Sequence, residues 1–353
     1  MRIGHGPVST TRSADTLFVA AGVASLCFFL ASASLFLACA HTISPPTRTE
    51  RADRLLRVGM QQYQKGDYED ALVRFNAALE ASNSIDYQEG VADALNNIAT
   101  VHLRQGDYEK ALENYGGALT IYRELHNSQG IATTLLNIGS THSALQNADA
   151  ARQHYQMALE TARANKLRSL EAKALNNLGL LMKETGDSEQ ARELYEQSLR
   201  INEREGNRMA VADNLNNLGT LSLSLNNADS ALDYYRRALE IDKELELPEA
   251  IALDLFNIAS AYQAKGDYAN ALTHYSRALA VFDFTANHTR IADTLFRIGL
   301  VSEQLGDGKR AAENYKSALA VATAAGMHEL ADQARSRLQE LSGEAASPAP
   351  EPE

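Results

Sequence analysis

The sequence predicts an all-α solenoid, an array of short helical hairpins that stack side by side. Three observations predict it: residues recur with a period of forty, the recurring columns have helical spacing, and a glycine–aspartate pair divides most periods in two. The alanine column reads Ala71, Ala111, Ala151, Ala191, Ala231, Ala271 and Ala311. A leucine column reads Leu55, Leu95, Leu135, Leu175, Leu215, Leu255 and Leu295. Seven copies in register, without an insertion, indicate about seven stacked units.

Each unit is expected to contain a helix, a tight turn and a second helix. In the second unit, the apolar residues between 92 and 102 follow one helical stripe, and those between 108 and 122 follow another. Gly106 and Asp107 separate the stripes, because glycine can take the left-handed conformation that ends a helix and aspartate can cap the next one. The same pair recurs at Gly66-Asp67, Gly186-Asp187, Gly266-Asp267 and Gly306-Asp307, while Gln146-Asn147 and Asn226-Asn227 replace it in units three and five.

Small and aromatic columns predict how these helices pack. The eighth position of the unit is always glycine or alanine, from Gly59 to Gly299, so the two helices of a unit can approach closely there. The second helix carries an aromatic column that we expect to fill the space between stacked units. It reads Phe75, Tyr115, Tyr155, Tyr195, Tyr235, Tyr275 and Tyr315.

This pattern resembles the tetratricopeptide repeat. The matching motif is L-N-N-[IL]-[AG] followed by G-D-Y-x-x-A-L-x-x-Y-x-x-A-L, found here as Leu95 to Ala99 and Gly106 to Leu119. The forty-residue unit is similar to the extended repeats of kinesin light chains. The resemblance implies a right-handed superhelical α-solenoid of about seven units, whose first helices line the concave face. We place the solenoid at residues 51–341, with a capping helix from about 330 at its end.

The amino-terminal segment lies outside the repeat register. Residues 16–38 carry no charge and follow Arg2 and Arg12, so residues 1–38 are predicted to be a signal peptide or a membrane anchor. An uncleaved helix of this length could span a bilayer. Alternatively, the segment ends in Ala38-Cys39 and resembles a bacterial lipoprotein signal, although Phe36 and Leu37 depart from that pattern. The second interpretation predicts a lipid on Cys39.

Both interpretations place the repeats outside the cytoplasm, on a membrane of the bacterial cell envelope. Because Ala40 rather than aspartate follows Cys39, the resemblance to lipoproteins favours the outer membrane, with the repeats facing the periplasm. Residues 39–50 are then a tether. Residues 342–353, rich in proline, alanine and glutamate, are predicted to be disordered.

Composition excludes several classes of function. The net charge of −12 argues against nucleic acid, whose binding proteins carry basic stripes. Both cysteines, Cys27 and Cys39, precede the repeats, so no disulfide is expected there. No glycine-rich phosphate loop, C-x-x-C or H-E-x-x-H motif occurs. We therefore expect no enzyme activity, no catalytic residue, no cofactor and no metal site.

The predicted concave face contains the candidate binding residues. Amides at its fifth position can bond the backbone of an extended peptide through both donor and acceptor. Phenylalanine at that position either anchors a ligand or packs on the adjacent unit or the cap. The candidate peptide-binding residues are Asn96, Asn176, Asn216, Phe256, Phe296 and Leu300. A second asparagine column, one residue further on, is interpreted as hydrogen bonding between repeats. It comprises Asn97, Asn137, Asn177, Asn217 and Asn257.

These observations predict a membrane-tethered scaffold that binds a protein or peptide segment on its concave face in an envelope assembly. One alternative is a sensor or regulatory ectodomain that binds a small envelope ligand. Another is a structural protein that self-associates.

Overall fold

The computed structural model describes residues 48–343, and over this range the predicted all-α solenoid is confirmed. The helices are α2 Arg48–Lys65, α3 Tyr68–Asn83, α4 Gln88–Gln105, α5 Tyr108–Glu124, α6 Ser128–Ala144, α7 Ala148–Ala164, α8 Arg168–Glu184, α9 Ser188–Glu205, α10 Arg208–Ser224, α11 Ala228–Glu244, α12 Pro248–Ala264, α13 Tyr268–Phe284, α14 His288–Gln304, α15 Gly308–Ala324 and α16 His328–Ser342. They form seven hairpins, here called repeats one to seven, and the final helix.

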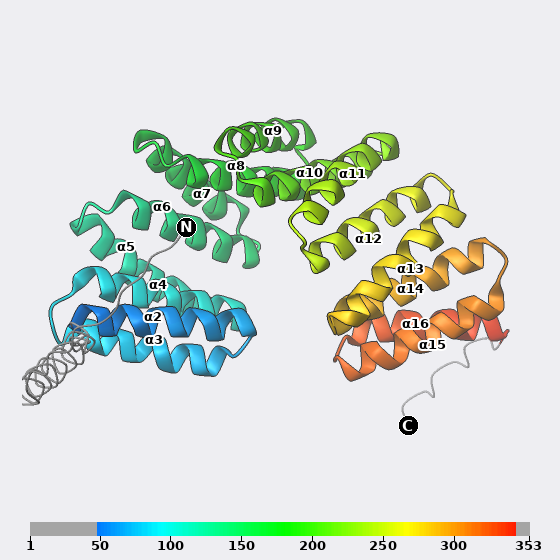
Figure 1. The fold of residues 1–353 in the computed structure, drawn as a ribbon, viewed down its shortest axis with the longest axis horizontal. Helices are drawn as coiled ribbons and strands as arrows, with labels where there is room; N and C mark the ends of the chain where they lie inside the picture. Colours follow the sequence, from blue (N-terminus) through cyan, green and yellow to red (C-terminus); the bar gives the residue numbers. More distant parts are fainter. Residues whose placement is uncertain (1–47, 344–353) are drawn as a thin grey trace, which may run out of the picture.

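The hairpins stack in chain order and curve into an arch, with repeat one at one foot and α16 at the other (Figure 1). Around the top of the arch, the second helix α9 lies outermost, and the first helices α8 and α10 lie beneath it. The first helices therefore line the inner side of this part of the arch.

The observed ends of the array differ slightly from the predicted ones. Helix α2 begins at Arg48, inside the segment predicted to be a tether, and α16 continues to Ser342. The predicted signal or anchor, Cys39 and nearly all of the predicted tail lie outside the described residues. Between residues 48 and 343, no helix has the length and apolar content needed to cross a bilayer.

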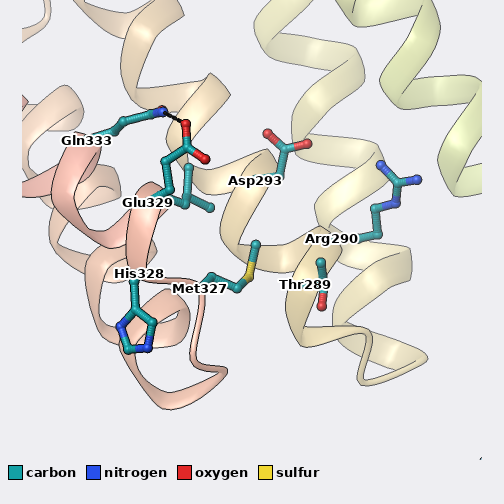
Figure 2. Close-up of a pocket in the computed structure, with 8 residues that line it drawn as sticks. Thr289, Arg290, Asp293, Met327, His328, Glu329 and Gln333 are labelled. Carbon is teal, nitrogen blue, oxygen red and sulfur yellow. Dashed lines mark hydrogen bonds between the residues drawn. The ribbon is translucent and has the colours of Figure 1, made fainter. Parts of the chain in front are cut away.

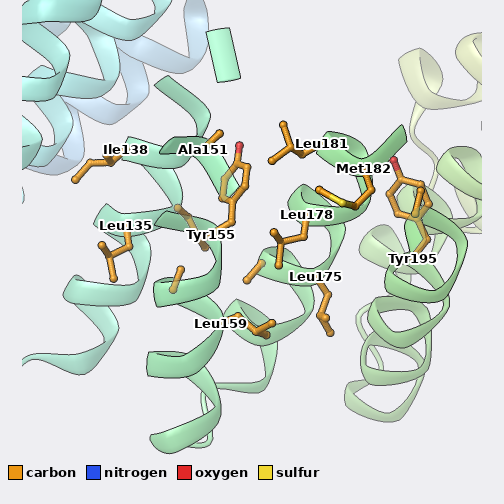
Figure 3. Close-up of a cluster of buried hydrophobic side chains, with 14 of the residues drawn as sticks. Leu135, Ile138, Ala151, Tyr155, Leu159, Leu175, Leu178, Leu181, Met182 and Tyr195 are labelled. Carbon is orange, nitrogen blue, oxygen red and sulfur yellow. The ribbon is translucent and has the colours of Figure 1, made fainter. Parts of the chain in front are cut away.

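The predicted leucine column forms the core of the central repeats. Leu135, Leu175 and Leu215 are each 1% exposed, and they belong to one apolar cluster that runs through several repeats. Figure 3 shows part of this cluster, where Tyr155 and Tyr195 lie among the leucines of neighbouring helices. Burial of these side chains holds each hairpin against the next.

The aromatic column packs inside each hairpin as well as between hairpins. At Gly219 an added Cβ would lie 2.5 Å from the ring of Tyr235, and at Gly299 it would lie 2.4 Å from Tyr315. Each of these tyrosines belongs to the second helix of the same repeat. The prediction that the eighth position needs a small residue is confirmed, but the aromatic ring itself is the reason.

The turns inside the repeats adopt the predicted left-handed conformation. The predicted glycines have positive φ, and repeat three uses Gln146, with φ 57°, in their place. Asp187, Asp267 and Asp307 cap the next helix through their side chains, as predicted. The same prediction was wrong for two aspartates: Asp67 makes no such bond, and the carboxylate of Asp107 instead lies 3.2 Å from Lys110 Nζ.

A second set of left-handed residues, which the sequence pattern did not reveal, lies in the turns between repeats. They are Asp86, His126, Lys166, Gly206, Glu246, Ala286 and Gly326. Every twentieth residue from Gly66 to Gly326 therefore has positive φ. The two kinds of turn share one backbone geometry although their sequences differ.

Candidate binding groove

The inner side of repeats five to seven contains a cavity of about 720 Å³. Its walls come mainly from the first helices α10, α12 and α14, which stack in sequence, and α16 closes one end with Arg337. The lining residues are Thr220, Leu223, Tyr235, Asn257, Ser260, Gln263, Ala264, Tyr268, Arg297, Leu300, Glu303, Gln304 and Arg337. We call this cavity the groove.

Two side chains give the groove a free hydrogen-bond acceptor and a free donor. Asn257 donates through Nδ2 to Asn216 Oδ1 at 3.2 Å, and none of the described residues donates to Asn257 Oδ1. Gln263 Oε1 accepts from the Tyr275 hydroxyl at 2.9 Å, and Gln263 Nε2 has no acceptor among the described residues. Burial raises the pKa of Tyr275 to about 12, and its hydroxyl therefore keeps the proton that it donates. An acceptor and a donor together match the polar groups of a peptide backbone.

The charged groups of the groove are partly paired. Arg337 lies 3.9 Å from Glu303 and 3.1 Å from Glu340, whereas Arg297 reaches Asp293 on its own helix at 3.5 Å. Leu223, Leu300 and Ala264 supply apolar surface between these groups. The groove thus combines polar, charged and apolar contacts.

Of the six predicted peptide-binding residues, only Leu300 lines the groove. Asn96, Asn176 and Asn216 instead accept hydrogen bonds from the next repeat. The donors are Asn137 at 3.2 Å, Asn217 at 2.8 Å and Asn257 at 3.2 Å, respectively. The interpretation of the second asparagine column as a link between repeats is confirmed for these three donors. The remaining two, Asn97 and Asn177, follow repeats that carry Leu56 and Leu136 at the accepting position, and they make no such bond.

Phe256 and Phe296 are each only 8% exposed. Their rings pack on Tyr275 and Tyr315, with ring centroids 5.1 Å and 5.4 Å apart, respectively. This placement favours the packing interpretation of the two phenylalanines, although the tyrosines that they contact belong to their own repeats and not to the adjacent unit or the cap.

The hydroxyls at the ninth position of the first helix are also used internally. Thr100, Ser140, Thr220 and Ser260 each bond the tyrosine hydroxyl of their own repeat. In repeat four, Leu180 takes this position, and the buried hydroxyl of Tyr195 has no partner within residues 48–343. The inner face therefore offers a ligand fewer polar groups than the sequence suggests.

Sequence reasoning missed Gln263, Arg297 and Arg337 as groove residues. Gln263 lies at the twelfth position of its unit, on the same inner stripe as the predicted positions, so helical spacing alone could have revealed it. Arg337 comes from the capping helix, whose placement over the last repeat has no counterpart in the forty-residue pattern.

A second cavity, of about 460 Å³, lies at the amino-terminal ends of α14 and α16. Figure 2 shows Met327 between these helices, with Asp293 and Glu329 near it and Arg290 at the edge. None of the predicted binding residues lines this cavity. It is confined to the first turns of α14 and α16 and does not extend along the stacked first helices, so it is less suited to an extended ligand.

The fold and the groove together define a repeat array for protein interaction. The tetratricopeptide repeat family model matches residues 49–124, 90–164, 170–244 and 249–324. The chain therefore belongs to the tetratricopeptide repeat family, whose members generally bind other proteins rather than catalyse reactions.

Solved structures with the same architecture are similar to the chain at low sequence identity. BtubC (BKLC) from P. vanneervenii is 23% identical, with a TM-score of 0.51, and the match covers 68% of this chain and 91% of that one. A Rap protein complexed with competence and sporulation factor is 19% identical, with a TM-score of 0.61, and the match covers 82% and 78%. No curated protein matches the chain in sequence.

A third similar structure is a signal transduction ATPase with numerous domains from Pyrococcus horikoshii, which carries a tetratricopeptide repeat sensor. It is 15% identical, with a TM-score of 0.67, and the match covers 83% of this chain and 44% of that one. At these identities the likeness establishes the fold alone.

Proposed function

We propose that the groove binds an extended segment of a protein partner and that the chain acts as a scaffold. The observation that carries this proposal is the combination of an unpaired acceptor, Asn257 Oδ1, and an unpaired donor, Gln263 Nε2, in one cavity along stacked first helices. Leu223 and Leu300 supply the apolar surface that an inserted side chain of the partner would cover. The similar Rap protein with its bound factor supports the view that such an array can hold a ligand.

The proposal includes a location. The uncharged segment and the Ala38-Cys39 junction support attachment to a bacterial envelope membrane, through a lipid on Cys39 or through an uncleaved helix. Mass spectrometry of the membrane-extracted protein tests this part. Loss of residues 1–38 with an added acyl mass supports the lipid, and a chain that still begins with Met1 supports the helix.

Capture from detergent-solubilised membranes, with the tagged full-length chain as bait, tests the groove. The double substitution Gln263→Ala and Leu300→Ala should reduce capture of a stoichiometric partner by tenfold or more, because loss of contacts in a buried hot spot costs about 2 kcal/mol. The matched control is Arg277→Ala with Lys316→Ala, which changes two exposed residues on the second helices α13 and α15. Capture by the control should equal that by the unmodified chain.

The remaining outcomes separate the alternatives. Equal capture by the groove variant and the control would remove the groove from the interaction. Capture of only the chain's own copies would favour the self-associating structural protein. Absence of any macromolecule, together with a small compound that raises the melting temperature, would favour the sensor that binds a small envelope ligand.

A further inference from the structure

Two aspartates are buried where repeats five and six pack against each other. We call such an interface between neighbouring repeats a joint. Asp242 in α11 is 3% exposed, and Asp254 in α12 is fully buried. Asp254 Oδ1 accepts a hydrogen bond of 2.7 Å from Asn216 Nδ2, whereas Asp254 Oδ2 has no donor. The side chain of Asp242 lies within hydrogen-bonding reach of Asp254. Two ionised carboxylates cannot bond each other, because neither has a proton to donate.

The joint between repeats four and five has asparagines at the corresponding positions, forty residues earlier. There Asn202 Nδ2 donates to Asn214 Oδ1 at 2.8 Å, and Asn214 Nδ2 donates to Asn176 Oδ1 at 3.0 Å. Amide and carboxyl groups have nearly the same shape, but the amide brings its own donors. The chain therefore contains a neutral and an ionisable version of the same joint.

Among the charged groups of residues 48–343 that act on the two carboxyls, none is a cation. The charged groups with the largest effect on Asp254 are Asp242 from α11 and the exposed Asp213 from α10, and none from α13 is among them. Burial, followed by these neighbouring charges, raises the pKa of Asp254 to about 8. Within residues 48–343, no group of three or more acidic, histidine or cysteine side chains has the arrangement of a metal site.

We propose that Asp242 and Asp254 share one proton and that this proton makes the joint between repeats five and six sensitive to pH. With the proton present, one carboxyl donates to the other and the orphaned Oδ2 gains its partner. When the proton leaves, two buried negative charges face each other without compensation, and α11 and α12 lose part of their attraction.

The sign of the effect follows from the direction of the shift. The raised folded-state pKa means that the stabilising contribution is fully present below about pH 4, where the unfolded chain also holds the proton. It declines as pH rises and is lost above the folded-state value of about 8. The joint should therefore loosen between neutral and mildly alkaline pH, and the neutral joint between repeats four and five should not respond.

Thermal unfolding of the full-length chain between pH 6 and pH 9 tests the proposal. We expect the melting temperature of the unmodified chain to fall by about 3–5 °C more than that of the double variant Asp242→Asn with Asp254→Asn. Hydrogen exchange, corrected for the intrinsic effect of pH, should show the extra opening in α11 and α12 and not in α8 and α9. Parallel curves for the two proteins would overturn the proposal.

A reciprocal variant keeps the test decisive if the first variant folds poorly. Asn202→Asp with Asn214→Asp places the acidic pair at the neutral joint between repeats four and five. This variant should gain a second pH-dependent opening, located in α9 and α10. A transplanted pair that opens no more at pH 9 than at pH 6 would show that two carboxyls in this geometry do not create the response.

Discussion

Repeats four and five have the same arrangement of helices, but among the described residues one buried polar atom without a partner lies inside repeat four, and another lies in the joint that follows repeat five. In repeat four the Tyr195 hydroxyl is buried beside Leu180 and has no partner, whereas in repeat five the Tyr235 hydroxyl bonds Thr220 at 3.1 Å. At the joints it is repeat four whose polar groups are satisfied, and repeat five whose polar groups are not. Amides close the joint that follows repeat four, and the joint that follows repeat five holds the two carboxyls.

The apolar and polar positions of this array are therefore specified separately. Leu175 and Leu215 are equally buried in the two repeats, so the apolar frame repeats faithfully. The polar partners change from one repeat to the next without altering that frame. Substitutions at equivalent positions of the two repeats can test this separation.

Truncation of the buried leucine should destabilise the protein equally in the two repeats. Leu175→Ala and Leu215→Ala should each lower the free energy of unfolding by about 2–5 kcal/mol, because both side chains lie in a packed core that collapses little. Chemical denaturation followed by circular dichroism measures this. An unchanged midpoint for either variant would show that its leucine does not contribute to the core. Clearly unequal losses of stability would show that the two repeats do not have the same apolar core.

Replacement of the glycine at the eighth position by alanine should change the stability by different amounts in the two repeats. A Cβ at Gly219 would lie 2.5 Å from the Tyr235 ring, and a Cβ at Gly179 would lie 2.8 Å from the Tyr195 ring. We expect Gly219→Ala to destabilise the array by about 1–3 kcal/mol and Gly179→Ala by less, because the Tyr195 hydroxyl has no bond that resists movement of the ring.

Gly116 provides the control for this pair. It lies inside a helix, and a Cβ there would meet nothing within 4 Å. Gly116→Ala should stabilise the protein by about 0.5–1 kcal/mol, since it only removes the flexibility of glycine. A loss of stability at Gly116 comparable to that at Gly219 would show that contact with the ring is not the cause.

Removal of the tyrosine hydroxyls should have opposite signs in the two repeats. Tyr195→Phe should raise the free energy of unfolding by about 1 kcal/mol, because it eliminates a buried group without a partner. Tyr235→Phe should lower it by about 1 kcal/mol, because Thr220 loses its bond. Paired denaturation curves decide the matter, and the same sign for both variants would contradict the assignment of partners.

The smallest predicted effect concerns the turns that follow the two repeats. Gly206 and Glu246 both adopt left-handed backbone, with φ of 70° and 53°. Glu246→Gly should stabilise the array by about 0.5 kcal/mol, and Gly206→Ala should destabilise it by about 1 kcal/mol. Melting temperatures of the two variants check this. Identical shifts would mean that the turn conformation does not limit stability.

The sequence alone predicted the number of hairpins, the leucine core and the small eighth position, because each depends on a column that every repeat preserves. It did not predict where the amides of the inner face bond. Asn176 is a free amide in an isolated repeat and becomes an acceptor only when Asn217 of the next repeat approaches. The groove was likewise missed in part, because Arg337 enters it from a helix outside the repeat pattern.

The left-handed residue at every twentieth position has a consequence for how such a chain can change length. Two equivalent turns forty residues apart, such as those at Gly206 and Glu246, have the same left-handed backbone conformation. A segment cut at both turns can be removed or duplicated, and the new junction then has the geometry of the old one. Removal of a segment of twenty residues meets the same backbone requirement at its ends, but it would join two first helices or two second helices and place the wrong side chains in the core. The segment that can be removed or duplicated without disturbing the core is therefore forty residues long, although the backbone geometry of the turns repeats every twenty residues.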